Sequence, residues 1–213
     1  MGIQINQYTL EKFEVGDEDY LDMDFWNGAS YESAKIKGMY VKSSFPRGIF
    51  TQTTGSPNVT GTTESTLLTT GSGSLTVGAD AFKVGDTFQL TMYGTIGAAN
   101  NEHLEIKLKA GSIILATTGS LTLPQITGLA WHMSVNFCVR SLGASGVGIL
   151  ITTGEFAYMK DSNLRHEAVL FASLNNSTFD TTISNTLDVT ATWGSANGAN
   201  KINSQLVLLE KQF

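Results

Sequence analysis

Cysteine is almost absent from this sequence, which holds a single one, Cys138, among 213 residues. One thiol cannot form an intrachain disulfide, and on its own it cannot build a zinc site. Proline is also scarce, at three residues, and charged side chains make up only 15% of the chain, against the ~25% usual in soluble domains. We therefore expect packing of uncharged side chains, and not cross-links, to hold the fold together.

Long apolar runs and clustered basic residues are missing as well. No stretch approaches the ~18 consecutive apolar residues of a membrane helix, and the N-terminus has neither the basic flank nor the apolar segment of a signal peptide. The net charge is −6, whereas a nucleic-acid surface needs Lys and Arg gathered along one face. We expect a soluble chain, made in a cytoplasm, with no membrane insertion and no nucleic-acid partner.

Threonine, glycine and β-branched residues are plentiful instead, and this composition favours strands over helices. From residue 49 onward, short segments alternate apolar and polar residues and are separated by turn residues. Strands are predicted at 49–53, 65–69, 74–77, 87–95, 103–109, 113–117, 131–139, 147–158, 168–172, 187–193 and 203–210. The fold predicted is an all-β antiparallel jelly-roll sandwich, closed by a hairpin of the last two strands.

Residues 1–47 have a different texture, with clustered acidic residues followed by basic ones. Segments 20–25 and 31–36 alternate around Asn27-Gly28, which is typical of a type I′ hairpin. Because an isolated hairpin is marginally stable in water, its apolar residues need another surface, either the main domain or a neighbouring chain, and we favour a neighbouring chain. The residues predicted for attachment and oligomerisation are Tyr20, Leu21, Met23, Phe25, Trp26 and Ile36. The predicted domains are an attachment segment, 1–47, and a knob, 48–213.

Catalytic and metal-binding motifs are weak. His132 and Cys138 lie on the same face of strand 131–139, with Ser134, Asn136 and Arg140, but residues i and i+6 of a strand are ~20 Å apart and cannot form a nucleophile and base pair. His103 and His166 lack the spacing of a zinc site, and the acidic residues of 17–24 lack a calcium-loop pattern. We expect no enzymatic activity, no cofactor and no metal.

Two pairs of segments carry a resemblance to a known class of proteins. Residues 77–88 leading to 93–96, together with 179–193, resemble a jelly-roll module of bacteriophage and other viral structural proteins. Residues 15–28 and 33–38 resemble the small attachment element that precedes phage fibre and spike knobs. The resemblance implies a homotrimeric head fibre, spike or capsid decoration in the virion. Its partners would be copies of itself, other virion proteins such as major capsid, portal or tail proteins, and a host-surface glycan.

Receptor contacts are expected in loops at one end of the sandwich. The candidate residues are Asn100, Asn101, Ser145, Asn197 and Asn200. The alternative function is a carbohydrate-binding β-sandwich without catalysis, in which Trp131, Tyr158 or Trp193 would stack on sugar rings. A glycan-degrading enzyme would need two carboxylates across a cleft, and the sequence shows no such pairing.

Overall fold

The computed structural model describes residues 20–26, 31–37, 47–163 and 165–213. Contacts divide the chain into two units, Met1–Pro46 and Arg47–Phe213. All regular secondary structure in the described residues is β-strand, so that part of the chain contains no helix able to cross a membrane. The all-β antiparallel class predicted from the sequence is confirmed.

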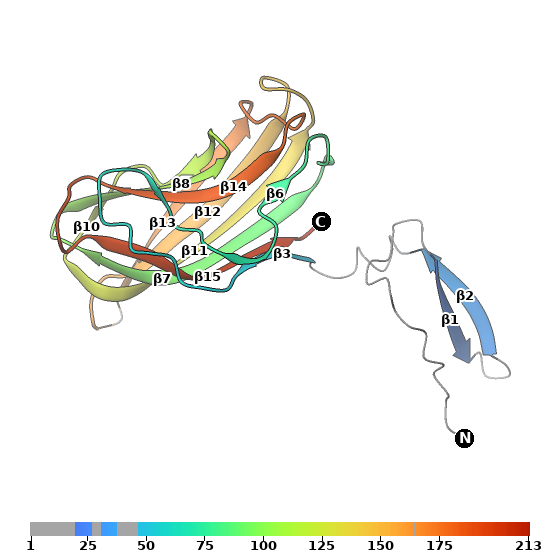
Figure 1. Ribbon diagram of the computed structural model, residues 1–213, viewed down its shortest axis with the longest axis horizontal. Coiled ribbons are helices and arrows are strands. Elements are labelled where there is room, and N and C mark those ends of the chain that lie inside the picture. The colour runs from blue at the N-terminus through green and yellow to red at the C-terminus, as the bar shows by residue number, and fades with distance from the viewer. Residues whose placement is uncertain (1–19, 27–30, 38–46, 164) are drawn as a thin grey trace. The chain divides into compact units, whose positions relative to one another are not determined.

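The first unit contains one antiparallel pair of strands, β1 (Tyr20–Trp26) and β2 (Tyr31–Lys37) (Figure 1). The register places Leu21 opposite Ile36 and Asp22 opposite Lys35. The two strands were predicted within one residue of these bounds. The turn predicted at Asn27-Gly28 lies outside the described residues.

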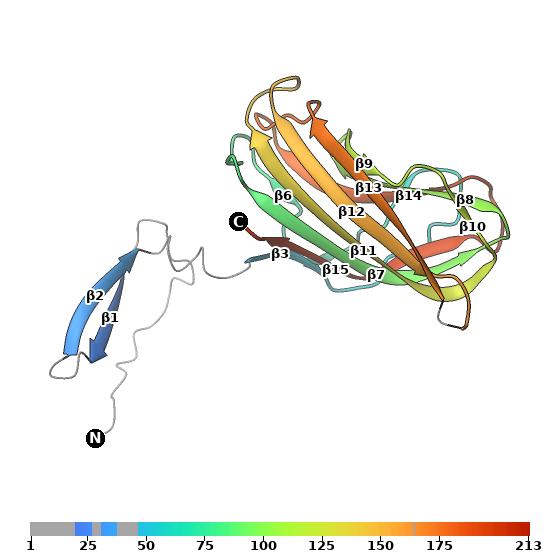
Figure 2. The same ribbon diagram turned by 180° about the vertical axis from the view of Figure 1, so that it is seen from behind.

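The second unit is a sandwich of two antiparallel sheets (Figures 1 and 2). The larger sheet has seven strands in the order β13-β12-β11-β7-β15-β3-β5. These strands are β3 (Arg47–Gln52), β5 (Gly71–Gly73), β7 (Thr87–Ala98), β11 (Ile126–Ser141), β12 (Ile149–Met159), β13 (His166–Asn176) and β15 (Lys201–Lys211).

The smaller sheet has six strands. Four follow the order β10-β8-β14-β4, while β9 also pairs with β8 and β6 also pairs with β14. The strands are β4 (Ser65–Thr66), β6 (Thr76–Val77), β8 (Glu102–Ala110), β9 (Ile113–Thr117), β10 (Leu121–Leu123) and β14 (Asn185–Trp193).

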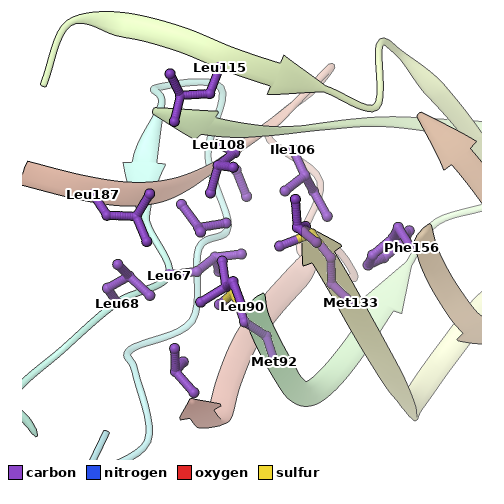
Figure 3. Close-up of a cluster of buried hydrophobic side chains, with 14 of the residues drawn as sticks. Leu67, Leu68, Leu90, Met92, Ile106, Leu108, Leu115, Met133, Phe156 and Leu187 are labelled. Atoms are coloured by element: carbon purple, nitrogen blue, oxygen red, sulfur yellow. The ribbon is translucent and has the colours of Figure 1, made fainter. Parts of the chain in front are cut away.

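One hydrophobic core fills the space between the sheets (Figure 3). Strand side chains alternate between the two faces of a sheet, and the long strands contribute their inward apolar residues to this core, β13 through the partly buried Phe171. Leu90 and Met92 of β7 and Met133 of β11 are buried there from the larger sheet, opposite Ile106 and Leu108 of β8 from the smaller one. The alternation read from the sequence in 104–109 and 131–139 therefore assigned the inward residues correctly.

The predicted closing hairpin is wrong. Strand β14 pairs with β8, β4 and β6 in the smaller sheet, whereas β15 pairs with β7 and β3 in the larger one. The loop 194–200 thus crosses from one sheet to the other. Period-2 alternation shows that a segment has one buried face, and both strands do, but it carries no information on which strand lies beside it.

Candidate functional site

The two outer faces of the sandwich differ in charge. On the smaller sheet, polar residues of β8 alternate with its core residues, and Lys107 and Lys109 both contact Glu64, with Nζ to carboxylate distances of 3.0 and 2.6 Å. Hydrogen bonds from Lys109 and Lys107 lower the pKa of Glu64 to about 2. Asp188 accepts a hydrogen bond from Thr66 on the same sheet. This face has the paired charges of an ordinary solvated surface.

The outer face of the larger sheet has very little charge. The register aligns its residues in three rows that cross β15, β7, β11, β12 and β13. The rows are Leu206, Tyr93, His132, Ala157 and Ala168; then Leu208, Thr91, Ser134, Glu155 and Leu170; then Glu210, Gln89, Asn136, Thr153 and Ala172. Glu155 and Glu210 are the only carboxylates in these rows, and no Lys or Arg is present.

Several large apolar residues of this face remain exposed in the single chain. Tyr93 is 46% exposed, Leu206 38% and Leu170 77%. Depletion of charge together with exposed aromatic and aliphatic side chains distinguishes the buried centre of a protein interface from the rest of a surface. We call the three rows the uncharged face. It is the surface of the described sandwich that best fits contact with another molecule.

A groove of ≈ 370 Å³ lies within the uncharged face, lined by Tyr93, Ala130, His132, Glu155, His166 and Ala168, among others. The rings of Tyr93 and His132 are stacked, with centroids 5.8 Å apart. His132 Nε2 lies 3.9 Å from Glu155 Oε1. The groove therefore combines an exposed aromatic ring with a carboxylate that can accept hydrogen bonds, which are the two elements needed to stack on and orient a polar ring.

The aromatic residues predicted to stack on sugar rings are buried and cannot offer an exposed ring face to a ligand. Trp131, Tyr158 and Trp193 are each at most 2% exposed, so the alternative prediction is wrong about these three. The strand face predicted for His132, Ser134, Asn136 and Cys138 is confirmed, because Trp131, Met133, Val135 and Phe137 are buried on the other side. In the described residues no group of three His, Cys, Asp or Glu side chains could hold a metal ion.

Loops 97–101 and 194–200 meet at one end of the sandwich. Asn200 is fully buried there and holds the two loops together, because its Oδ1 accepts the Ala99 N–H at 3.0 Å and its Nδ2 donates to the Ser195 carbonyl at 3.1 Å. Ser195 Oγ donates to Glu102 Oε2 at 2.5 Å. Asn200 is therefore a structural residue, and its predicted role in receptor contact is wrong. Asn100, Asn101 and Asn197 are exposed at this end, as a contact residue must be.

Ser145 is exposed at the opposite end of the sandwich. Its loop contacts the segment after β13, where Gly146 N donates to Ser177 O and Thr181 N donates to Gly143 O. Strand β11 runs the length of the larger sheet, from Ile126, opposite Ala98, to the end that holds this loop. The prediction that all three loops share one end is wrong, and only 97–101 and 194–200 do.

The residues predicted for attachment lie on the paired strands of the first unit. Tyr20, Leu21, Met23, Phe25 and Trp26 belong to β1, and Ile36 belongs to β2. The register places Tyr20 opposite Lys37 and Trp26 opposite Tyr31. Their role in attachment stays a prediction.

The sequence analysis missed Tyr93, Glu155, Leu170 and Leu206 as surface residues of interest. Tyr93 had a readable signal, because it is out of phase with Phe88, Leu90 and Met92 on the same strand. The other three join the uncharged face through pairing between strands that are distant in sequence.

Comparison with known proteins adds no family: a scan against protein-family models and a search of curated proteins both gave no match for this chain. The functional argument therefore depends on the residues themselves.

Proposed function

We propose that this chain is a non-catalytic structural protein of a virus particle, a head fibre, spike or capsid decoration that assembles as a homotrimer. The sandwich, with jelly-roll connectivity, would be the knob, and residues 1–47 would attach it to a capsid or tail protein. The observation that carries the proposal is the uncharged face, because three neighbouring rows with so little charge are suited to being buried against copies of the same chain.

Two further observations support parts of the proposal. From β3 to β8 the chain crosses between the sheets at every step, as expected if a ribbon of strands is rolled into a jelly roll. The chain also divides at Pro46 into a small two-stranded unit and a large sandwich. A two-stranded unit gains stability by packing on another surface, which suits an attachment element.

Light scattering of the full chain at low micromolar concentration tests assembly directly. The proposal expects three times the chain mass of 22.8 kDa. Tyr93→Glu adds a charge to the uncharged face and should shift the mass toward one chain, because a buried unpaired carboxylate is costly. Val84→Glu is the matched control, since Val84 is also exposed but lies in the turn before β7. A wild-type monomer would overturn the homotrimer.

A chain that begins at Arg47 separates the contributions of the two units. If it remains a trimer, assembly belongs to the sandwich; if it becomes a monomer while remaining folded by circular dichroism, assembly belongs to the first unit. Pull-down of purified capsid or tail proteins by the full chain, but not by the shortened one, would support attachment through residues 1–46.

The groove beside Tyr93 favours a second candidate function, binding of a neutral saccharide on the uncharged face. A sugar ring would stack on Tyr93 while Glu155 accepts hydrogen bonds from its hydroxyl groups. Screening the full chain on a glycan array, followed by calorimetry with any hit, tests this function. Tyr93→Ala should abolish binding, and Val84→Ala should leave it unchanged. Equal binding by the wild type and by Tyr93→Ala would dismiss this groove as the site.

A further inference from the structure

Strand β13 forms one edge of the larger sheet. It pairs with β12 along one side, and no other strand of the described residues pairs with its second side (Figure 2). Strand β9 of the smaller sheet approaches only near its C-terminal end, where Asn176 Nδ2 donates to the Ile114 carbonyl at 2.7 Å. From His166 to Ser173 its register with β12 is regular, from Met159 opposite His166 to Thr152 opposite Ser173. This edge therefore presents a straight row of backbone N–H and C=O groups that a further strand can pair with.

Several features that normally protect an edge strand are missing from β13 before Ser173, where its pairing with β12 becomes irregular. Its sequence, HEAVLFASLNN, has no proline and no lysine, and Glu167 is its only residue with a formal charge at neutral pH. Lys160 Nζ lies 2.8 Å from Glu167 Oε2 and pairs that charge. Leu170 and Leu174 are 77% and 68% exposed. A long, uncharged edge with exposed leucines is suited to strand addition.

We propose that two copies of this chain join edge to edge through β13, antiparallel and about a two-fold axis at Leu170, so that one sheet continues across both copies. The strand fits its own copy in this register. Leu170 lies opposite Leu170, Ala168 opposite Ala172, and Glu167 opposite Ser173, so no carboxylate meets its own copy. Uncharged pairs directly opposite each other stabilise an antiparallel sheet, whereas like charges there destabilise it.

This contact is distinct from the homotrimer proposed above. A two-fold axis makes both copies use the same patch, while a three-fold ring joins two different patches of neighbouring copies. The edge contact would therefore link one trimer to another, or act alone if the chain does not form a trimer. The two proposals can fail separately.

Cysteine cross-linking of the full chain tests the register. In a Cys138→Ser background, Ala168→Cys, Leu170→Cys and Ala172→Cys are each oxidised and run on a denaturing non-reducing gel. Residues opposite each other in an antiparallel pair have Cα atoms about 4.5–5.5 Å apart, within the range of a disulfide. We expect a two-chain band that is strongest at position 170 and falls several-fold at 168 and 172. Val84→Cys, at a position that is also exposed but does not belong to β13, is the control for random collision.

A Leu170→Lys variant gives a second measurement, since it places two ammonium groups opposite each other. Because Leu170 also belongs to the uncharged face, the variant is made in the Tyr93→Glu background, where that face already carries a charge. There, light scattering should show Leu170→Lys lowering the mass from two chains to one, with Val84→Lys unchanged. Cross-linking at 170 no stronger than at 84, or an even profile over 168–172, would overturn the edge contact. A wild-type trimer without the cross-link would support the homotrimer and overturn the edge contact. A cross-linked species of two chains only would support the edge contact and overturn the homotrimer.

Discussion

The indole nitrogen of Trp131 donates a hydrogen bond to the carbonyl oxygen of Asn203 at 3.0 Å, although their strands, β11 and β15, are separated by β7. The bond passes over Gly94 of β7, which lies opposite both Trp131 and Ser204. The register of β15 shifts immediately after Ser204, so the bond spans the irregular part of the sheet. Because Gly94 has no side chain, Trp131 can reach across β7 to the Asn203 carbonyl of β15.

Gly94→Ala should therefore be among the most damaging single-atom additions to this chain. A β-carbon there would overlap the Asn203 carbonyl and lie 2.8 Å from Trp131 Nε1. We expect a loss of more than about 3 kcal/mol of unfolding free energy, or failure to fold, because the clash is with backbone. Chemical denaturation measures it. Gly198→Ala is the control, since nothing lies within 4 Å of its β-carbon. Equal stability of the two variants would contradict the role of Gly94.

Thr152→Val should stabilise the sandwich. The Thr152 side chain is fully buried, and its hydroxyl has no hydrogen-bond partner among the described residues. Valine has nearly the same shape and removes the cost of the unsatisfied hydroxyl, so we expect a gain of about 1 kcal/mol. Thr153→Val, on the exposed face of the same strand, should change stability by less than about 0.5 kcal/mol. Thermal unfolding of both variants checks the difference, and destabilisation by Thr152→Val would show that its hydroxyl does find a partner.

Acid should weaken the sandwich through Glu102. Hydrogen bonds from Asn200, Ser195 and the His103 N–H lower its pKa from 4.5 to about 2. A depressed carboxyl pKa stabilises the folded chain above the unfolded pKa, and this stability is lost as the pH falls from about 4.5 to 2. Glu102→Gln should cost roughly 1–3 kcal/mol at pH 7, and its unfolding free energy should fall less steeply than that of the wild type below pH 4.5. Parallel curves for the two proteins would contradict this account. Glu64→Gln, which removes the other strongly shifted carboxyl, should leave the Glu102 part of the slope in place.

The two asparagines of the end loops should behave differently. Asn200→Ala removes a fully buried side chain that bonds both loops, and we expect a loss of about 2 kcal/mol as the Ala99 N–H and the Ser195 carbonyl lose their partner. Asn100→Ala, in an exposed position of the facing loop, should change stability by less than about 0.5 kcal/mol. Urea denaturation of both variants measures this. Near-equal midpoints would show that Asn200 does not tie the loops together.

Much of the fold could be predicted because strand alternation is local information. The segments 104–109 and 131–139 alternate cleanly, and the structure buries the residues that the pattern placed inward. Strands β5 and β10 were not predicted, and they have three residues each. Three residues are too few for a period-2 pattern to stand out from a turn.

Pairing between distant strands could not be predicted in the same way. The uncharged face requires β7, β11, β12, β13 and β15 to be neighbours in a particular register, and a one-residue slip in any of them would turn its side chains to the other face. Asn200 was misassigned for a related reason. In the sequence it is one more polar residue of a Gly- and Asn-rich loop, and its burial results from β15 beginning beside the end of β7.

The position of β15 sets the order in which this protein can be completed during synthesis. This strand follows all the other described strands of the sandwich in sequence, yet it lies between β3 and β7 in the larger sheet. While the ribosome is still making residues 201–211, the strands made first have open edges where β15 will insert. The sandwich can therefore close only after residues 201–211 have been made, and emergence of its earlier strands is not sufficient for the final folding step.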